Sequence, residues 1–509
     1  MFVNVLVANR GEIALRIMST CRAMGIDCTA VYTDEDEKLP HVRFADHRVP
    51  LGPDPYAYLD RELLMEACRR AGADALHPGY GFLAEDAALS EQCAKHQIEF
   101  IGPPAELMRK MGSKLSAREH MSSRGIVSLP ASGPLDSPES ALAEAERIGY
   151  PVIVKASGGG GGRGMRVCHN PDALTAGFGP ARDEAQRYFG DPTLYVEKYL
   201  VRPRHIEVQV TVDKAGHAAH FWERMCSLQR RHQKLVEEAP AVVLEDEPRR
   251  ELCERAAKSV EGLTGLNAAT LEFLFPSHPV PDGEPACYFI EANTRIQVEH
   301  PVTEMVTGVD LIREQLRIAA GEPVAETPPL RGTAIEFRIN VEDPVNAFAP
   351  GTGRITSYRL PSGAGLRADH FLSPGLEVTG TYDALLAKLI VWGSDRDEAL
   401  RRARSALAET EVAGVPTNIP FHSFVVSSLA FREGFYDTGY VEAHAELLNS
   451  WLDEWGLPPG LDGYETPGAT AQNATATSGL TPWRRRGVEE LMDSRATALA
   501  GPRGWGRKA

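Results

Sequence analysis

The chain lacks the features of several large protein classes. Its 509 residues include only eight cysteines, and none of them forms a C-x-x-C pair, so neither a disulfide framework nor a cysteine-ligated zinc site is indicated. The longest run without charged residues, 412–431, contains two prolines and three serines, which argues against a membrane-spanning helix. No Walker A P-loop and no H-E-x-x-H motif occurs, which excludes classical P-loop ATPases and that class of zinc protease.

Positive charge is also in short supply. The chain has 54 Lys and Arg residues against 70 Asp and Glu, a formal net charge of −16, and a field of that sign repels the phosphate backbone of nucleic acids. We therefore expect neither a nucleic-acid nor a membrane partner. A strand-like run at residues 2–8 stands where a signal peptide would have a basic segment before an apolar one, so the predicted location is the cytoplasm.

The remaining composition, 43% hydrophobic and 24% charged, is typical of a globular protein with about three domains. Residues 1–112 alternate short apolar strands with helical patterns, which predicts a parallel α/β sheet. Residues 113–321 contain consecutive strands with short turns, which favours an α+β domain, and residues 331–445 predict a smaller α+β unit. Residues 446–509 are interpreted as a linker and tail of unknown role, because part of this stretch is uncharged and rich in Ala, Thr, Ser and Gly.

A glycine-rich segment is the densest local signal. Six of the seven residues 158–164 are glycine, and ordering them is costly unless their backbone N–H groups serve a ligand. A strand-like run follows where the dinucleotide-binding G-x-G-x-x-G motif requires a helix. With Lys155 before the glycines and Arg163 among them, the segment is better interpreted as a flap over a nucleoside triphosphate. A glycine linker is the alternative.

A second signal is a run of alternating polar residues at 290–300. If this run is extended, every second side chain shares one face. A hairpin with the strand-like run 271–275 would bring Glu272 near Glu291, and such hard oxygen ligands suit Mg²⁺. An exposed edge strand is the alternative. The side chains predicted to share this face are Glu291, Asn293, Arg295, Gln297 and Glu299.

Isolated basic residues leave more than one interpretation open. The cluster at 229–234 suits a nucleotide or bicarbonate site, or a solvated charged face. His205 alone would be an ordinary strand histidine, and Lys114 alone an ordinary surface lysine. Glu299 beside Arg295 would form a base and anion-binding pair.

Taken together, the motifs resemble those of the biotin carboxylases of the ATP-grasp superfamily. The resemblance covers about residues 2–445 and runs in the family's order. It is carried by ANRGEIALRI at 8–17, HPGYGFLAED at 77–86, KASGGGGGRGM at 155–165, EKYL at 197–200, SLQRRHQKLVEEAPA at 227–241, EANTRIQVEHPVTE at 291–304 and EFRINVEDP at 336–344.

The resemblance implies a fold of three parts. These are an N-terminal Rossmann-like parallel-sheet domain, a central ATP-grasp domain with a mobile lid at about 130–200, and a C-terminal α+β biotin carboxylase domain.

The resemblance also implies a set of site residues. ATP would be bound by Lys114, Lys155, Gly161, Gly162, Glu197, Lys198, Leu200, His205, Gln229 and His232, together with Glu272 and Glu291. The metal, Mg²⁺ or Mn²⁺, would be held by Glu272, Glu291 and Asn293. Bicarbonate would contact Lys234, Arg295, Gln297, the backbone of Val298, and Glu299, while Tyr80 and Arg338 would lie near biotin.

The implied reaction is the ATP- and bicarbonate-dependent carboxylation of biotin. Glu299 would deprotonate bicarbonate, carboxyphosphate would form, and Arg338 would stabilise the biotin enolate. No Met-Lys dipeptide occurs in the chain, so we expect biotin on a separate carrier protein and a carboxyltransferase on other chains. A homodimer is also expected.

The expected setting is the first half-reaction of an acyl-CoA carboxylase, and thus fatty acid biosynthesis. The alternatives are the biotin carboxylase subunit of a two-subunit pyruvate carboxylase, another ATP-grasp carboxylate–amine ligase, and a catalytically silent assembly subunit.

Overall fold

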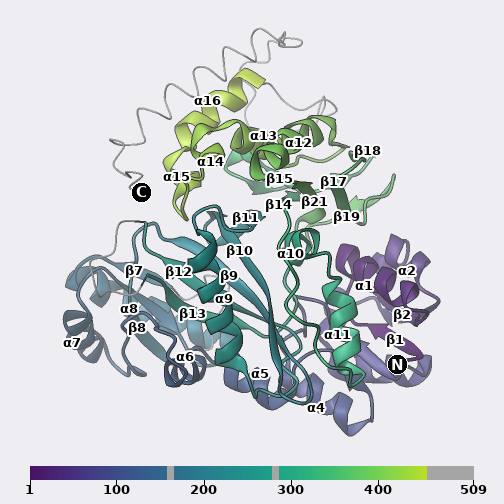
Figure 1. Cartoon of the computed structure of the whole chain (residues 1–509), viewed down its shortest axis with the longest axis horizontal. Coiled ribbons are helices and arrows are strands. Elements are labelled where there is room, and N and C mark those ends of the chain that lie inside the picture. The colour runs from purple at the N-terminus through teal and green to yellow at the C-terminus, as the bar shows by residue number, and fades with distance from the viewer. Residues whose placement is uncertain (158–164, 278–285, 456–509) are drawn as a thin grey trace. The chain divides into compact units, whose positions relative to one another are not determined.

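A computed structural model describes residues 1–157, 165–277 and 286–455. The glycine-rich flap, with Gly161 and Gly162, lies outside the described residues, as does most of the tail. The described residues divide into two compact units, one formed by residues 1–331 with 437–439, the other by residues 332–436 with 440–455 (Figure 1).

The first unit opens with a five-stranded parallel sheet, as the alternation of strands and helices predicted. Its order is β3-β2-β1-β4-β5, so the strand order reverses between β1 and β4, and the loops after these two strands meet. Asn9, after β1, joins them by donating from Nδ2 to the carbonyl oxygens of Pro78 and Tyr80, both at 2.7 Å. The strands are β1 (Asn4–Val7), β2 (Asp27–Thr33), β3 (His47–Gly52), β4 (Ala75–His77) and β5 (Glu99–Phe100).

Amphipathic helices cover this parallel sheet. The apolar side of α1 (Gly11–Ala23) packs into the same core as β1 and β2. The other helical segments here are η1 (Asp34–Asp36), α2 (Pro40–Phe44), η2 (Pro55–Leu59), α3 (Arg61–Ala71), α4 (Ala87–Lys95) and α5 (Ala105–Gly112).

A small antiparallel sheet with its own core follows. Its order is β7-β6-β8, and two helices pack on it to bury a cluster of Val, Leu and Ala side chains. The elements are α6 (Lys114–Ser123), which precedes it, then α7 (Pro138–Ile148), β6 (Val152–Ala156), β7 (Arg166–Cys168), α8 (Pro171–Phe189) and β8 (Leu194–Lys198).

The site is built on five antiparallel strands in the order β13-β12-β9-β10-β11. Helix α9 (Asp246–Val260) packs against β9 and β10 (Figure 1). The strands are β9 (Arg204–Val212), β10 (Ala218–Arg230), β11 (Gln233–Ala239), β12 (Ala269–Phe275) and β13 (Tyr288–Asn293), followed by α10 (His300–Thr307) and α11 (Leu311–Ala319).

The second unit is α+β, as predicted. Antiparallel strands in the order β14-β21-β19 pack against α12 (Arg396–Glu409). The three strands are β14 (Thr333–Asn340), β19 (Leu366–His370) and β21 (Leu385–Gly393).

Short elements complete the second unit. The paired strands are β15 (Glu342–Asp343) with β16 (Ala349–Pro350), β17 (Gly353–Arg354) with β20 (Glu377–Val378), and β18 (Ser357–Arg359) with β22 (Glu411–Ala413). The helical segments are η3 (Pro344–Asn346), α13 (Ile419–Ser427), α14 (Leu429–Arg432), α15 (Tyr440–Ala443) and α16 (Ala445–Trp455). Across the described residues of both units, no helix is long and apolar enough to cross a bilayer.

Candidate active site

Four strands of the central sheet each contribute one charged residue to a single row. Arg224 on β10, Glu207 on β9, Glu272 on β12 and Glu291 on β13 are successive register partners. Register partners in an antiparallel sheet point to the same face, so the row forms one surface. The predicted pairing of Glu272 with Glu291 is confirmed.

A second row lies two residues along the same strands. It consists of Gln209, Thr270 and Asn293, again as register partners. Asn293 donates from Nδ2 to Glu272 Oε1 at 2.8 Å and so links the two rows. The site face is therefore polar over two consecutive rows, in a sheet whose strands are otherwise rich in buried apolar residues.

Lys234, on β11, is the hub of the site. Its ammonium donates to Glu207 Oε2 at 2.5 Å and to Glu299 Oε1 at 2.6 Å, and it lies 3.2 Å from both Glu272 Oε1 and Gln297 Oε1. Burial by itself disfavours the charged form, but the three carboxylates outweigh burial and raise the pKa of Lys234 well above its usual range. Lys234 is thus a fixed positive charge.

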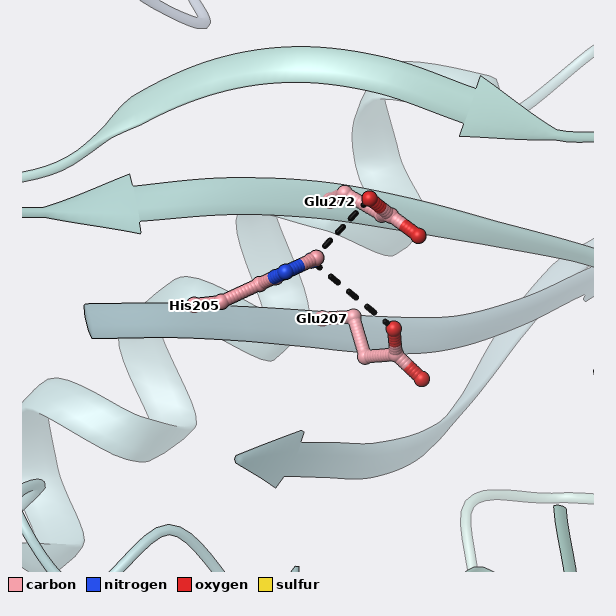
Figure 2. A group of neighbouring side chains, drawn as sticks. All are labelled: His205, Glu207 and Glu272. Atoms are coloured by element: carbon pink, nitrogen blue, oxygen red, sulfur yellow. Dashed lines mark ion pairs between the residues drawn. The ribbon is translucent and has the colours of Figure 1, made fainter. Parts of the chain in front are cut away.

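His205 reaches from β9 toward two carboxylates, Glu207 on the same strand and Glu272 on β12 (Figure 2). Its Nε2 lies 3.0 Å from Glu272 Oε2 and 4.0 Å from Glu207 Oε2. Its Nδ1 lies 2.8 Å from Nε2 of Gln229, which is a donor, so the imidazole proton is assigned to His205 Nε2, the nitrogen nearest to Glu272. Burial raises the pKa of Glu272, but Lys234 and His205 outweigh burial and lower it, so Glu272 is ionised.

The prediction that the extended run continues to Glu299 is wrong. Strand β13 ends at Asn293, and the next residues bend and turn into α10, of which Glu299 is the N-cap. Pro301 suits the first turn of a helix and favours this ending. The turn still brings Glu299 to Lys234 and places Gln297 Nε2 3.3 Å from Glu272 Oε1. Val298 lies within the turn.

Arg295 is held by a residue that the sequence analysis missed. Its Nε donates to Glu85 Oε2 at 3.0 Å, and the other oxygen of Glu85 accepts from the backbone N–H of Thr294 at 2.9 Å. Glu85 lies in the loop after β4, so the parallel sheet contributes directly to the site. Burial lowers the pKa of Arg295, but Glu85 and Glu299 outweigh burial and raise it.

Two further residues of the site were also missed. Glu207 and Arg224 lie in the part of the chain, 113–321, for which the sequence predicts consecutive strands, but neither was assigned a role there. The signal in the sequence was the alternation His205, Glu207, Gln209 along a strand whose intervening residues are buried and apolar.

Several residues assigned to ATP lie on the small sheet β7-β6-β8 and on α6. Lys155 on β6 pairs with the buried carboxylate of Glu197 on β8, which also pairs with Arg118 on α6. Lys114, at the start of α6, lies 3.2 Å from Glu291 Oε2 and so joins this group to the charged row. Lys198 donates to the carbonyl oxygens of residues 149 and 150 at 2.8 and 3.0 Å.

The other predicted residues are placed as follows. Leu200 follows β8, and His232 lies at the exposed turn between β10 and β11 with a positive φ of 69°. Tyr80, after β4, donates its hydroxyl to Glu12 Oε1 on α1. Arg338 lies on β14 in the second unit, where its carbonyl oxygen accepts from Asn418 Nδ2 at 2.9 Å and His422 Nε2 at 2.7 Å.

The donor set fits a hard divalent cation. Glu272 and Glu291 are direct register partners, and like charges in that position repel each other unless a cation lies between or beside them. Asn293 adds an amide oxygen one row away. Carboxylate and amide oxygens are the ligands that Mg²⁺ prefers, with phosphate oxygens and water completing its octahedron.

Comparison with known families agrees with this geometry. The family model for the biotin carboxylase N-terminal domain matches residues 1–108, that for the ATP-binding domain of the carbamoyl-phosphate synthase L chain matches 113–327, and that for the biotin carboxylase C-terminal domain matches 336–443. The biotin carboxylase of Pseudomonas aeruginosa is 46% identical over 449 residues, which cover 87% of this chain and 98% of that protein. The chain belongs to the biotin carboxylase family. It is therefore an ATP-dependent ligase, and the predicted family and fold class are confirmed.

Other relatives resemble the chain to a similar degree. A pyruvate carboxylase subunit from Methanothermobacter thermautotrophicus is 45% identical over 456 residues, which cover 88% of this chain and 91% of that protein. A solved biotin carboxylase domain dimer of the Hydrogenobacter thermophilus 2-oxoglutarate carboxylase, in complex with MgADP, ADP and bicarbonate, is 44% identical, with a TM-score of 0.85 over 88% of this chain and 99% of that one. Membership of this family decides against the other ATP-grasp ligase, and none of these relatives supports a silent subunit.

Proposed function

We propose that the chain carboxylates biotin on a separate carrier protein, using ATP and bicarbonate, by way of carboxyphosphate. The observation that supports this most is the hub at Lys234. The half-buried ammonium of Lys234 contacts Glu299, and the guanidinium of Arg295 lies in the same turn as Glu299. Two cations beside one carboxylate form a site that can bind an anion and remove its proton.

Bicarbonate would lie between Lys234 and Arg295, with Gln297 and the backbone N–H of Val298 fixing its orientation. Glu299 Oε1 would exchange its hydrogen bond from Lys234 for the proton of the bicarbonate hydroxyl. Because Glu299 is the N-cap of α10, the helix fixes the position of its backbone. The proposed base would therefore stay in place while its hydrogen-bond partner changes.

The nucleotide would lie along the strands next to the charged row. Lys114 and Lys155 would exchange their carboxylate partners, Glu291 and Glu197, for phosphate oxygens. His205, with its proton held on Nε2, Gln229 and His232 would complete the nucleotide contacts, with Lys198, Leu200 and the glycines at 161 and 162.

Glu272, Glu291 and Asn293 would hold Mg²⁺ or Mn²⁺. When bound, such an ion neutralises charge on the phosphate oxygens. The carboxyphosphate formed is labile in water, so the reaction would require water to be excluded from the site. Tyr80 and Arg338 would orient biotin, Arg338 stabilising its enolate.

The partners follow from the same proposal. We favour a homodimer in the cytoplasm that serves an acyl-CoA carboxylase, with the carrier and carboxyltransferase on other chains. A pyruvate carboxylase is the second candidate, because a relative at 45% identity belongs to a pyruvate carboxylase. Carboxylation assays with the co-purified partner chains and acetyl-CoA, pyruvate or 2-oxoglutarate as acceptor would separate these settings.

Bicarbonate-dependent ATP hydrolysis, measured with and without free biotin, tests the proposed reaction. Stimulation by biotin is the expected result. Stimulation by an amine in place of biotin, or no bicarbonate-dependent hydrolysis at all, would contradict it.

A further inference from the structure

Arg224 is a large, fully buried cation at one end of the charged row. Its side chain is 0% exposed, and it is the bulkiest of the side chains buried to this degree among the described residues. Burying a guanidinium is costly unless its donors find acceptors. Those acceptors are protein groups on three other elements, so Arg224 acts on the site through other residues.

The first route from Arg224 to the reaction centre runs through Glu207. Arg224 Nε donates to Glu207 Oε1 at 2.6 Å, while the other oxygen of Glu207 accepts from Lys234 at 2.5 Å. Lys234 in turn donates to Glu299. With one oxygen fixed by Arg224, the Glu207 carboxylate can present only the other oxygen to the ammonium.

The second route runs through the helix that begins at the base. Arg224 Nη1 donates to Thr303 Oγ1 at 3.0 Å. Thr303 lies one turn into α10, whose N-cap is Glu299, so this contact fixes the helix that carries the base. Further donations, to Gln209 Oε1 at 2.9 Å and Thr270 Oγ1 at 3.1 Å, fix the plane of the guanidinium.

We propose that Arg224 is a positioning residue that sets Lys234 and Glu299 at the spacing bicarbonate requires. Three carboxylates, those of Glu207, Glu272 and Glu299, share the single ammonium of Lys234. Arg224 gives Glu207 a second cation. Without Arg224, the Glu207 carboxylate would attract Lys234 more strongly. Less of the positive charge of Lys234 would then be available to bicarbonate.

This inference rests on the proposed function, because it concerns how well bicarbonate is bound. The test compares Arg224→Met, Arg224→Lys and a matched control, Arg249→Met. Arg249 donates to the buried Glu223 at 2.8 Å, the neighbour of Arg224 on β10, which points to the opposite face. The control thus breaks a buried pair between α9 and the same strand, β10, without changing a residue of the charged row.

Steady-state ATP hydrolysis at saturating Mg²⁺ is the assay. For Arg224→Met we expect the KM for bicarbonate to rise about tenfold or more, since charge-assisted hydrogen bonds are lost, while the KM for ATP stays within about twofold. Arg224→Lys should recover part of this, because a lysine keeps the charge beside Glu207 but cannot reach all four acceptors. Arg249→Met should lower Tm and leave the KM for bicarbonate unchanged.

An Arg224→Met protein with a lowered Tm and an unchanged KM for bicarbonate would overturn the inference, as would a rise in this KM for Arg249→Met equal to that for Arg224→Met. Should Arg224→Met fail to fold, Thr303→Val removes the hydrogen bond from Arg224 to α10 with a side chain of the same shape. A rise of about twofold to fivefold in the KM for bicarbonate is then expected, with Thr307→Val on the same helix as the control, and no rise would overturn the inference. A wild-type protein without bicarbonate-dependent hydrolysis would instead refute the proposed function, and the inference with it.

Discussion

The two faces of strand β10 each bury an arginine–glutamate pair, and the pairs differ in what lies beyond them. On one face, Glu223 Oε1 accepts from Arg249 at 2.8 Å and from the backbone N–H of Ala241 at 3.0 Å, and its other oxygen lies 3.7 Å from Cys253 Sγ. On the other face, Glu207 accepts from Arg224 with one oxygen, and its second oxygen accepts a hydrogen bond from Lys234. A buried ion pair alone is therefore weak evidence of function. The informative feature is which group the second carboxylate oxygen contacts.

The electrostatics of the two faces differ in the same sense. Burial raises the pKa of Glu223 in spite of Arg249, whereas Lys234 and His205 reverse the effect of burial at Glu272 and lower its pKa. The first face stabilises a carboxyl group that gains a proton readily. The second keeps Glu272 charged, as a ligand of a metal ion must be.

Replacement of Glu299, the proposed base, should give the largest effect and the clearest contrast between the two faces of β10. For Glu299→Gln we expect bicarbonate-dependent ATP turnover to fall by about 10²-fold to 10⁴-fold, because the proton of bicarbonate loses its acceptor. Binding of MgATP, measured by calorimetry, should remain nearly intact. Undiminished turnover would remove Glu299 as the base.

Glu291, one of the proposed metal ligands, provides the next test. Glu291→Ala should raise the Mg²⁺ concentration needed for half-maximal turnover by about 10-fold to 100-fold, since one hard ligand is lost. A titration of activity with Mg²⁺ measures it, with Glu223→Gln on the opposite face as the control. An unchanged requirement in Glu291→Ala would contradict the assignment.

Breaking the pair on the other face should affect stability alone. Arg249→Met leaves Glu223 buried without its cation and should lower the free energy of unfolding by about 3–5 kcal/mol, as removal of one partner of a buried pair does. Urea unfolding measures this. A loss of bicarbonate affinity in the folded Arg249→Met protein would blur the distinction between the faces.

The smallest effect is an opposite dependence of stability on pH. The pKa of Glu272 is lowered by folding, so its contribution is complete above the ordinary value of 4.5 and is lost as the pH falls below it. The pKa of Glu223 is raised, so its contribution is present below 4.5 and is lost as the pH rises through the raised value.

Glu272→Gln should therefore flatten the acid limb of the plot of unfolding free energy against pH, and Glu223→Gln should flatten the part above 4.5, each by about 1.4 kcal/mol per unit of pKa shift. Urea unfolding at a series of pH values measures both slopes. Matching slopes in the two variants would contradict the contrast.

Local patterns in the sequence were sufficient for the hairpin that joins Glu272 to Glu291, because its two strands are close along the chain and alternate clearly. They failed just beyond it, where Pro301 and the contact of Thr294 with Glu85 end the strand. Glu85 and Arg295 are 210 residues apart, and no local pattern relates them.

The members of the row differ in the same respect. Arg224 and Glu207 become neighbours only through the register of β9 and β10. The sequence predicts consecutive strands across residues 113–321. It could not show which partner each would face. For Lys234 and His205, local patterns left several interpretations open, and only the family resemblance indicated roles for them.

The ion pair between Glu85 and Arg295 has a consequence for protein engineering. The loop after β4 contributes the carboxylate that holds Arg295, whereas the charged row of Glu207, Arg224, Glu272 and Glu291 comes from much later in the chain. A chimaera whose first hundred residues come from a relative would need a glutamate at this position to keep the ion pair with Arg295. The three family segments are thus not freely interchangeable modules.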